Sequence, residues 1–112
     1  MKKYQLGEFE EFVLLTVGVL HGDAYGVTIK EEIEKRLKRK VSIGALQSAL
    51  RRMEEKGFIV SELGETTKAR GGKRKRYFKI TAHGKKALDY NMETRMSLYN
   101  EIRDIALQFQ TC

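Results

Sequence analysis

Apolar residues recur at intervals of three and four along most of the chain, which predicts helices rather than strands. The pattern predicts three helices, over about Glu8–Leu20, Ala24–Arg39 and Ile43–Lys56. The apolar face of the third helix consists of Leu46, Ala49, Leu50 and Met53. The first helix is apolar over a broader face, so we expect it to lie at the centre of the domain.

Short polar residues and glycines mark the ends of these helices. Asp23, Ser42 and Thr81 each precede a helical pattern, and each carries an oxygen that can accept a hydrogen bond from an unpaired backbone N–H. We therefore expect all three to be N-caps. Gly57 follows the third helix and tolerates the left-handed conformation with which helices commonly end. The chain is thus predicted to leave helical structure at Gly57.

The residues after Gly57 have the pattern of a β-hairpin followed by one long helix. Phe58–Leu63 and Lys75–Ile80 are predicted strands that flank a glycine-containing tip. Between Ala82 and Phe109 there is no proline and only one glycine, which predicts a continuous helix. The predicted fold is α+β and mostly α: a winged helix-turn-helix domain with an N-terminal arm over residues 1–81, and a C-terminal dimerisation helix over residues 82–112.

Apolar residues of this last helix advance by alternating threes and fours, which is typical of a seam that packs against another helix. They are Leu88, Met92, Met96, Tyr99, Ile102, Ala106 and Phe109. Since the domain already contains three helices, the same helix of a second subunit is the most economical partner, and we expect a homodimer. The methionines and aromatic residues would also suit an apolar cleft for a small hydrophobic or aromatic effector, although packing explains them with fewer assumptions.

Positive charge is concentrated in one segment of the chain. The sequence has 22 Lys and Arg residues against 15 Asp and Glu, a net charge of +7 that favours an anionic partner. Seven of the cations, with no acid among them, are Lys68, Arg70, Lys73, Arg74, Lys75, Arg76 and Lys79. A solvated loop is the alternative explanation, but such a cluster after a helix-turn-helix favours contact with the phosphates of double-stranded DNA. Phosphate contacts supply affinity and carry no base information.

We expect the third helix to supply the choice of DNA sequence. Its candidate contact residues are Gly44, Ala45, Gln47, Ser48, Arg51 and Arg52. Gln47 and Arg51 have the donors and acceptors that match adenine and guanine edges. The arginines could instead pair with nearby acids or with phosphates, and one of them is expected to face the second helix. Tyr25 is expected to pack its ring and to turn its hydroxyl toward a phosphate at the start of that helix.

Several other classes of protein are disfavoured. His21, His83 and Cys112 lack the spacing of metal ligands, so we expect neither a metal site nor a cofactor. The sequence contains no glycine-rich phosphate loop and no nucleophile paired with a base at a recognisable spacing, which argues against an enzyme. A single cysteine allows no internal disulfide and favours a reducing, cytoplasmic location. The apolar run Phe12–Leu20 is too short to cross a bilayer.

Three segments resemble the PadR family of transcriptional regulators. They are Asp23–Gly26, Ala49–Gly57 and Lys73–Gly84. The resemblance, to the short-tailed type, implies a winged helix, a C-terminal dimerisation helix and repression from a palindromic site. The chain departs from the family pattern at Leu46-Gln47-Ser48, where the family commonly carries Leu-Tyr-Pro. An aromatic DNA contact expected from the family is therefore missing, so we expect either a different base readout at Gln47 and Ser48 or a DNA affinity that rests more on the wing.

The resemblance also implies that aromatic acids or hydrophobic drugs can act near the dimer interface, although no residue identifies an effector. Two alternatives to a site-specific regulator stay open at this point. One is a winged-helix module that meets an acidic protein surface. The other is a protein that coats DNA without a preferred sequence, which would share all the electrostatic features described above.

Overall fold

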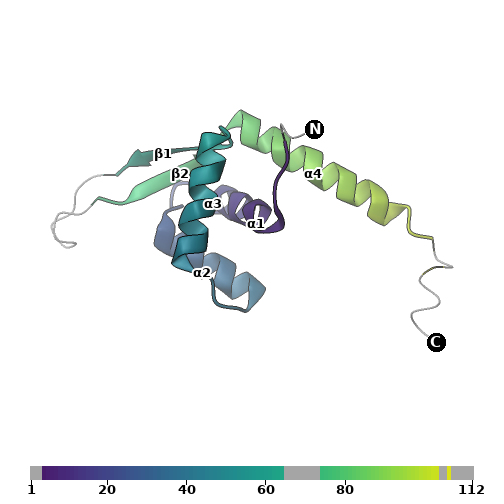
Figure 1. Cartoon of the computed structure of the whole chain (residues 1–112), viewed down its shortest axis with the longest axis horizontal. Helices are drawn as coiled ribbons and strands as arrows, with labels where there is room; N and C mark the ends of the chain where they lie inside the picture. Colours follow the sequence, from purple (N-terminus) through teal and green to yellow (C-terminus); the bar gives the residue numbers. More distant parts are fainter. Residues whose placement is uncertain (1–3, 65–73, 104–105, 107–112) are drawn as a thin grey trace.

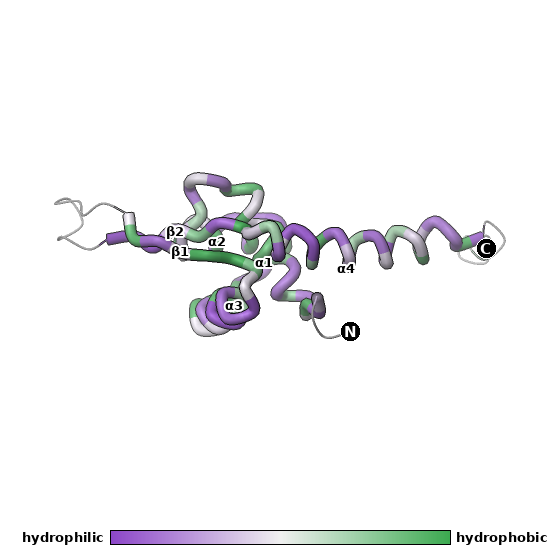
Figure 2. Tube along the Cα trace, turned by 90° about the horizontal axis from the view of Figure 1, so that it is seen from above, coloured by the Kyte–Doolittle hydropathy of each residue, from purple (hydrophilic) through white to green (hydrophobic). Residues whose placement is uncertain are grey.

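The computed structural model describes residues 4–64, 74–103 and 106. Its elements are α1 (Glu8–Val19), α2 (Gly26–Leu37), α3 (Ile43–Glu55), β1 (Ile59–Leu63), β2 (Arg76–Ile80) and α4 (Ala82–Asn100). The strands form an antiparallel hairpin, and α4 extends away from the three packed helices on the side opposite the hairpin (Figure 1). Seen from above, the hairpin and α4 lie roughly along one line, with α3 beside the hairpin (Figure 2). The predicted α+β, mostly helical winged fold is confirmed.

The core is built around α1, as its broad apolar face predicted. Val13, Leu14 and Val17 are almost completely buried, and α1 contacts α2, α3, β2 and α4. The predicted apolar face of α3 is buried against it. Burying a large apolar side chain of this kind contributes about 1.5–3 kcal/mol, so this shared core holds the four helices and the hairpin together.

Two of the three predicted N-caps are confirmed. The N–H of Ala45 donates to Ser42 Oγ over 3.2 Å, and the N–H of Gly84 donates to Thr81 Oγ1 over 3.0 Å. Gly57 has the predicted left-handed conformation, with a φ of 81°.

The prediction that Asp23 caps the second helix is wrong. The N-cap of α2 is Tyr25, whose N–H donates to Thr28 Oγ1 over 3.0 Å. The same Thr28 hydroxyl donates to the backbone oxygen of Asp23. A cap at Asp23 would start the helix at residue 24, but α2 starts two residues later, at Gly26. The unpaired N–H group near its start, that of Tyr25, is therefore satisfied by Thr28 within the helix and not by Asp23.

A tight junction joins the hairpin to α4. A Cβ on Gly84 would lie 2.1 Å from the carbonyl oxygen of Phe58, so only glycine fits at this position. That carbonyl accepts the N–H of Thr81 over 3.0 Å, and the Thr81 hydroxyl donates to the Gly57 carbonyl over 2.6 Å. The ring of Phe58 is buried and lies 5.1 Å from the ring of His83. The start of α4 is therefore fixed directly to the end of α3 and the start of the hairpin.

The hairpin has a defined register and a second attachment to the domain. Ile59 is opposite Ile80, and Leu63 is opposite Arg76. The N–H of Phe78 donates to the carbonyl of Ala24 over 2.8 Å, which ties β2 to the segment before α2. Each predicted strand began one residue earlier than the observed one. The predicted tip between the strands lies outside the described residues.

The predicted continuous helix to Phe109 is wrong. Helix α4 ends at Asn100 with Glu101 as its C-cap, and Ile102 and Arg103 are not helical. All residues from Met92 to Asn100 are exposed, so this part of the helix has no buried face in the single chain to offset the entropy cost of extending it. No helix in the described part of the chain has both the length and the apolar character needed to span a membrane.

Candidate nucleic-acid interface

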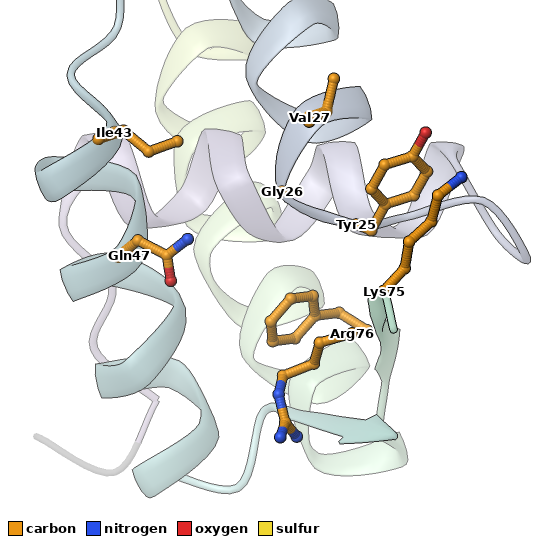
Figure 3. A pocket seen from close by; sticks show the side chains of 8 residues that line it. Tyr25, Gly26, Val27, Ile43, Gln47, Lys75 and Arg76 are labelled. Carbon is orange, nitrogen blue, oxygen red and sulfur yellow. The ribbon is translucent and has the colours of Figure 1, made fainter. Parts of the chain in front are cut away.

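One surface combines the start of α2, the outward side of α3 and the beginning of β2. A hollow of about 390 Å³ lies between these elements. Side chains from all three line it, and Figure 3 shows those of Ile43 and Gln47 extending from α3 toward it, with Tyr25 and Lys75 across from them. Because the apolar stripe of α3 is turned into the core, the residues between the stripe positions are left facing outward.

Helix α3 presents most of its predicted contact residues to solvent. Gly44, Ala45, Gln47 and Arg51 are exposed, and Ser48 is half-buried. Gln47 and Arg51 also line a smaller groove of about 170 Å³ that they share with Arg76 of β2. The structure therefore brings the two predicted base-reading side chains next to a predicted phosphate-binding cation. A Cβ on Gly44 would lie 3.6 Å from Ser42 Oγ, an ordinary contact, so none of the described residues requires glycine there.

Arg52 is turned away from this surface. It was a candidate DNA contact, and one of the two arginines was expected to face the second helix. Instead Arg52 Nε lies 2.8 Å from Glu10 Oε2 on α1, and Lys56 Nζ lies 3.4 Å from Glu10 Oε1. The Glu10 carboxylate is buried and also accepts the N–H of Gly7 over 3.0 Å. Arg52 thus links α3 to α1, and a DNA contact by its half-exposed side chain stays a prediction.

The pKa of Glu10 reflects this arrangement. Burial raises its pKa, but the hydrogen bonds from Arg52 and Gly7 and the charge of Lys56 outweigh burial and hold the pKa below its usual value of 4.5. The ionised form is therefore the one that the folded protein favours.

Two arginines of the wing are held in place by neutral groups, whereas Lys79 of β2 lies 3.5 Å from Glu62 Oε1 of β1. Arg74 Nε donates to the carbonyl of Gly64 over 2.7 Å. Arg76 Nη1 donates to Ser61 Oγ over 3.0 Å, and that hydroxyl donates to Glu54 on α3 over 2.8 Å. None of these partners removes the charge of the arginines, which stay exposed. Lys68, Arg70 and Lys73, also predicted to contact DNA, lie outside the described residues.

Tyr25 joins the start of α2 to the wing. Its ring is half-buried and meets the ring of Tyr77 edge-on, with the ring centres 5.5 Å apart. Lys75 Nζ lies 4.2 Å from the centre of the Tyr25 ring, within the range of a cation–π interaction. The Tyr25 hydroxyl points away from the ribbon of the domain (Figure 3). The ring is packed as expected, and a phosphate contact by the hydroxyl stays a prediction.

Two apolar side chains of this surface were missed by the sequence prediction. Val27 is 52% exposed and Ile43 is 54% exposed, and both line the larger hollow. Val27 lies off the apolar repeat of α2, which was a usable signal. Ile43 shares the spacing of the buried α3 residues, so the pattern alone gave no sign that it is exposed.

The predicted dimerisation residues divide into two groups. Leu88 is only 7% exposed and is part of the domain core, so its side chain is already used within the chain. Met92, Met96, Tyr99 and Ile102 are exposed. Ala106 is exposed beyond the end of α4, and Phe109 lies outside the described residues. The available apolar stripe therefore begins at Met92.

Two contacts set the direction of α4 beside this stripe. Arg95 Nη1 lies 2.7 Å from Glu11 Oε1 of α1, so the two side chains form an ion pair. The Glu11 oxygen is buried and accepts no well-aligned hydrogen bond from the described residues. Asn91 Nδ2 donates to the backbone oxygen of Tyr4 over 2.9 Å.

Within the described ranges, no three His, Cys, Asp or Glu side chains gather where they could hold a metal ion.

The fold and this surface define a winged-helix protein, and comparison identifies the family. The model of the transcriptional regulator PadR-like family matches residues 14–90, which is more than half of the chain. The chain therefore belongs to the PadR-like family of transcriptional regulators. No curated protein sequence shows significant similarity to it.

Solved structures share the fold over most of their length. A PadR-like transcription factor from Bacteroides fragilis is 24% identical, with a TM-score of 0.70 over 87% of this chain and 88% of its own. A transcriptional regulator from Clostridium thermocellum is 27% identical, with a TM-score of 0.64 over 84% of this chain and 92% of its own. A PadR-like regulator from Bacillus cereus is 19% identical, with a TM-score of 0.68 over 88% and 90%.

Replacing Glu10 with glutamine should weaken the attachment of α3 to α1. We expect Glu10→Gln to lower the free energy of unfolding at pH 7 by about 1–2 kcal/mol, because Arg52 and Lys56 lose their charged partner but are themselves partly exposed. Since the folded-state pKa of Glu10 is lowered, the stabilisation is present above about pH 4.5 and is lost as the pH falls further. Urea unfolding at pH 7 and pH 3.5 measures both effects.

Glu32→Gln provides the matched control. Glu32 Oε2 lies 2.6 Å from Arg36 Nε on α2, and the pKa of Glu32 is also lowered, but Arg36 is exposed and the pair joins no two elements. We expect a smaller change in stability for this variant. Equal stability of Glu10→Gln and the wild-type protein at pH 7 would contradict the role given to Glu10.

Proposed function

We propose that this PadR-like regulator is a homodimeric repressor that binds an inverted-repeat DNA operator through α3 and its basic wing. The observation that carries the proposal is the convergence of Gln47, Arg51 and Arg76 on one groove between α3 and β2. Base-reading and phosphate-binding side chains are the two components that a site-specific DNA surface needs. Repression is what the family resemblance implies.

The two components would have different tasks. Helix α3 would enter the major groove with Gly44, Ala45, Gln47, Ser48 and Arg51 toward the bases, since its apolar face is fixed to the core. Arg74, Lys75 and Arg76 would contact phosphates, together with Lys68, Arg70 and Lys73 of the tip and the hydroxyl of Tyr25. Arg52 would act indirectly, by holding α3 on Glu10.

We further propose that residues 82–112 form the dimerisation segment of a chain whose residues 1–81 bind DNA. The exposed stripe that begins at Met92 supports this, because it is apolar and lies on a helix that extends away from the domain. A two-fold pair of α4 helices would cover it and present two α3 helices to DNA. The methionines and Tyr99 of the same stripe would line any cleft that accepts a hydrophobic effector.

Selection of bound duplexes from a randomised library, at about 150 mM salt to screen nonspecific attraction, tests the proposal. We expect an enriched inverted repeat with half-site centres about one helical turn, roughly 34 Å, apart. Strong binding without an enriched sequence would identify a DNA-coating protein instead. No binding would contradict DNA recognition and favour the protein-interaction module, whose partner would be captured even after nuclease treatment.

Variants of the wing and of α3 should separate affinity from sequence choice. We expect Arg74→Ala with Arg76→Ala to weaken binding to all duplexes alike and to reduce the salt dependence by about one counterion per lost contact. Gln47→Ala should instead change the ranking of sequences, with a loss of about 1–3 kcal/mol at one base pair. Lys35→Ala, on the solvated side of α2, is the control for net charge. Identical effects of the wing and Gln47 variants would refute this division.

A charge placed on the exposed stripe of α4 should separate the subunits. We expect Met96→Lys to weaken dimerisation by about 100-fold or more, because an unpaired charge would be buried between the helices. Met96 is 47% exposed in the single chain, so the domain itself should stay folded. Ser97→Lys, one position further along the exposed helix, should leave the dimer intact. Sedimentation equilibrium of both variants and the wild-type protein makes the comparison, and equal association constants would contradict the assignment.

A further inference from the structure

The hollow between α2, α3 and β2 has an apolar part that the proposed DNA contacts do not use. Val27 and Ile43 are each more than half exposed, although Ile29 and Ile33 of α2 and the stripe from Leu46 to Met53 of α3 are buried. A single exposed apolar side chain is ordinary on a protein surface. Here two of them, from different helices, line the same hollow. Within the described part of the chain, neither belongs to the buried core or to the half-buried apolar residues packed against it.

The rim of the hollow indicates the kind of molecule that would cover it. Gln47, Lys75 and Arg76 line the same space and supply an amide and two cations. No acid is among the described residues that line it. The surface thus favours a polyanion that also presents a small apolar group next to hydrogen-bonding groups. Double-stranded DNA meets this description, because the 5-methyl group of thymine projects into the major groove beside the polar base edges.

We propose that Ile43 and Val27 read thymine, by contact of their side chains with its 5-methyl group. The inference rests on the proposed function and adds the base that this part of the surface selects. Ile43 is the first residue of α3, where a helix in the major groove reaches the bases, and Gln47 follows it one turn later. A thymine methyl in the hollow removes apolar surface of both partners from water. Cytosine carries hydrogen at the same position and loses that contact.

Deoxyuridine tests the inference because it differs from thymidine only by the missing methyl group. Each thymine of the enriched operator is replaced in turn, symmetrically in both half-sites, and affinity is measured by fluorescence anisotropy. We expect one or two positions at which the wild-type protein loses about fourfold in affinity per half-site, the effect of one buried carbon. Substitution at the other thymines should change affinity less than twofold.

Variants connect the missing methyl group to particular side chains. Ile43→Ala or Val27→Ala should weaken binding to the thymine operator and bind the thymine and uracil versions of the sensitive position equally well. Val60→Ala removes an equally exposed apolar side chain from β1, and it should keep the full difference between the two duplexes. Thermal unfolding confirms that the variants are folded, which we expect because both side chains are largely exposed.

The outcomes separate this inference from the function on which it rests. Failure to enrich any operator would overturn the proposed function and this inference with it. An enriched operator that binds equally well with thymine or uracil at every position would overturn this inference alone, and would leave a small apolar ligand as the occupant of the hollow. A methyl effect that persists unchanged in both Ile43→Ala and Val27→Ala would also overturn it.

Discussion

The contact between Gly84 and the carbonyl of Phe58 sets the relative arrangement of α3, the hairpin and α4. A side chain at position 84 would overlap this backbone oxygen, so α4 can start here only because the residue is glycine. The same carbonyl accepts the N–H of Thr81, the residue that caps α4. Helix α3, the hairpin and α4 therefore meet within a few residues. A change in the direction of any one of them would displace the other two.

Two neighbouring acids of α1 extend this control across the domain. Glu10 pairs with Arg52 and Lys56 of α3, and Glu11 pairs with Arg95 of α4. Partly buried ion pairs of this kind give little net stability, because desolvation opposes the attraction between the charges. Their geometric effect is larger, since each pair holds one helix in a particular orientation on α1. The helix that would read DNA, α3, and the helix that would set the spacing between two α3 helices, α4, are therefore both oriented by α1.

The proposed DNA surface is organised before any ligand arrives. Lys75 lies over the ring of Tyr25, and Arg76 is held by Ser61, so both cations are oriented by neutral groups that leave their charge available. Ordering these long side chains in advance lowers the entropy lost on binding. Cations and the apolar patch of Val27 and Ile43 then serve different purposes. In the proposed complex the cations would attract any phosphate backbone, whereas the apolar patch would distinguish one base from another.

The amino-acid pattern alone determined the helices, the hairpin and the caps at Ser42 and Thr81, because these depend on residues that are close in sequence. It also located the outward residues of α3, since the helical period leaves them no other direction. Apart from the local misplacement of the α2 cap at Asp23, the failures share one physical cause, which is distance along the chain. Arg52 finds its partner at Glu10, Ile43 is exposed although Leu46 and Leu50 at the same spacing are buried, and the end of α4 depends on which surfaces can cover it. Only the tertiary structure decides which apolar positions have a neighbour and which charges meet.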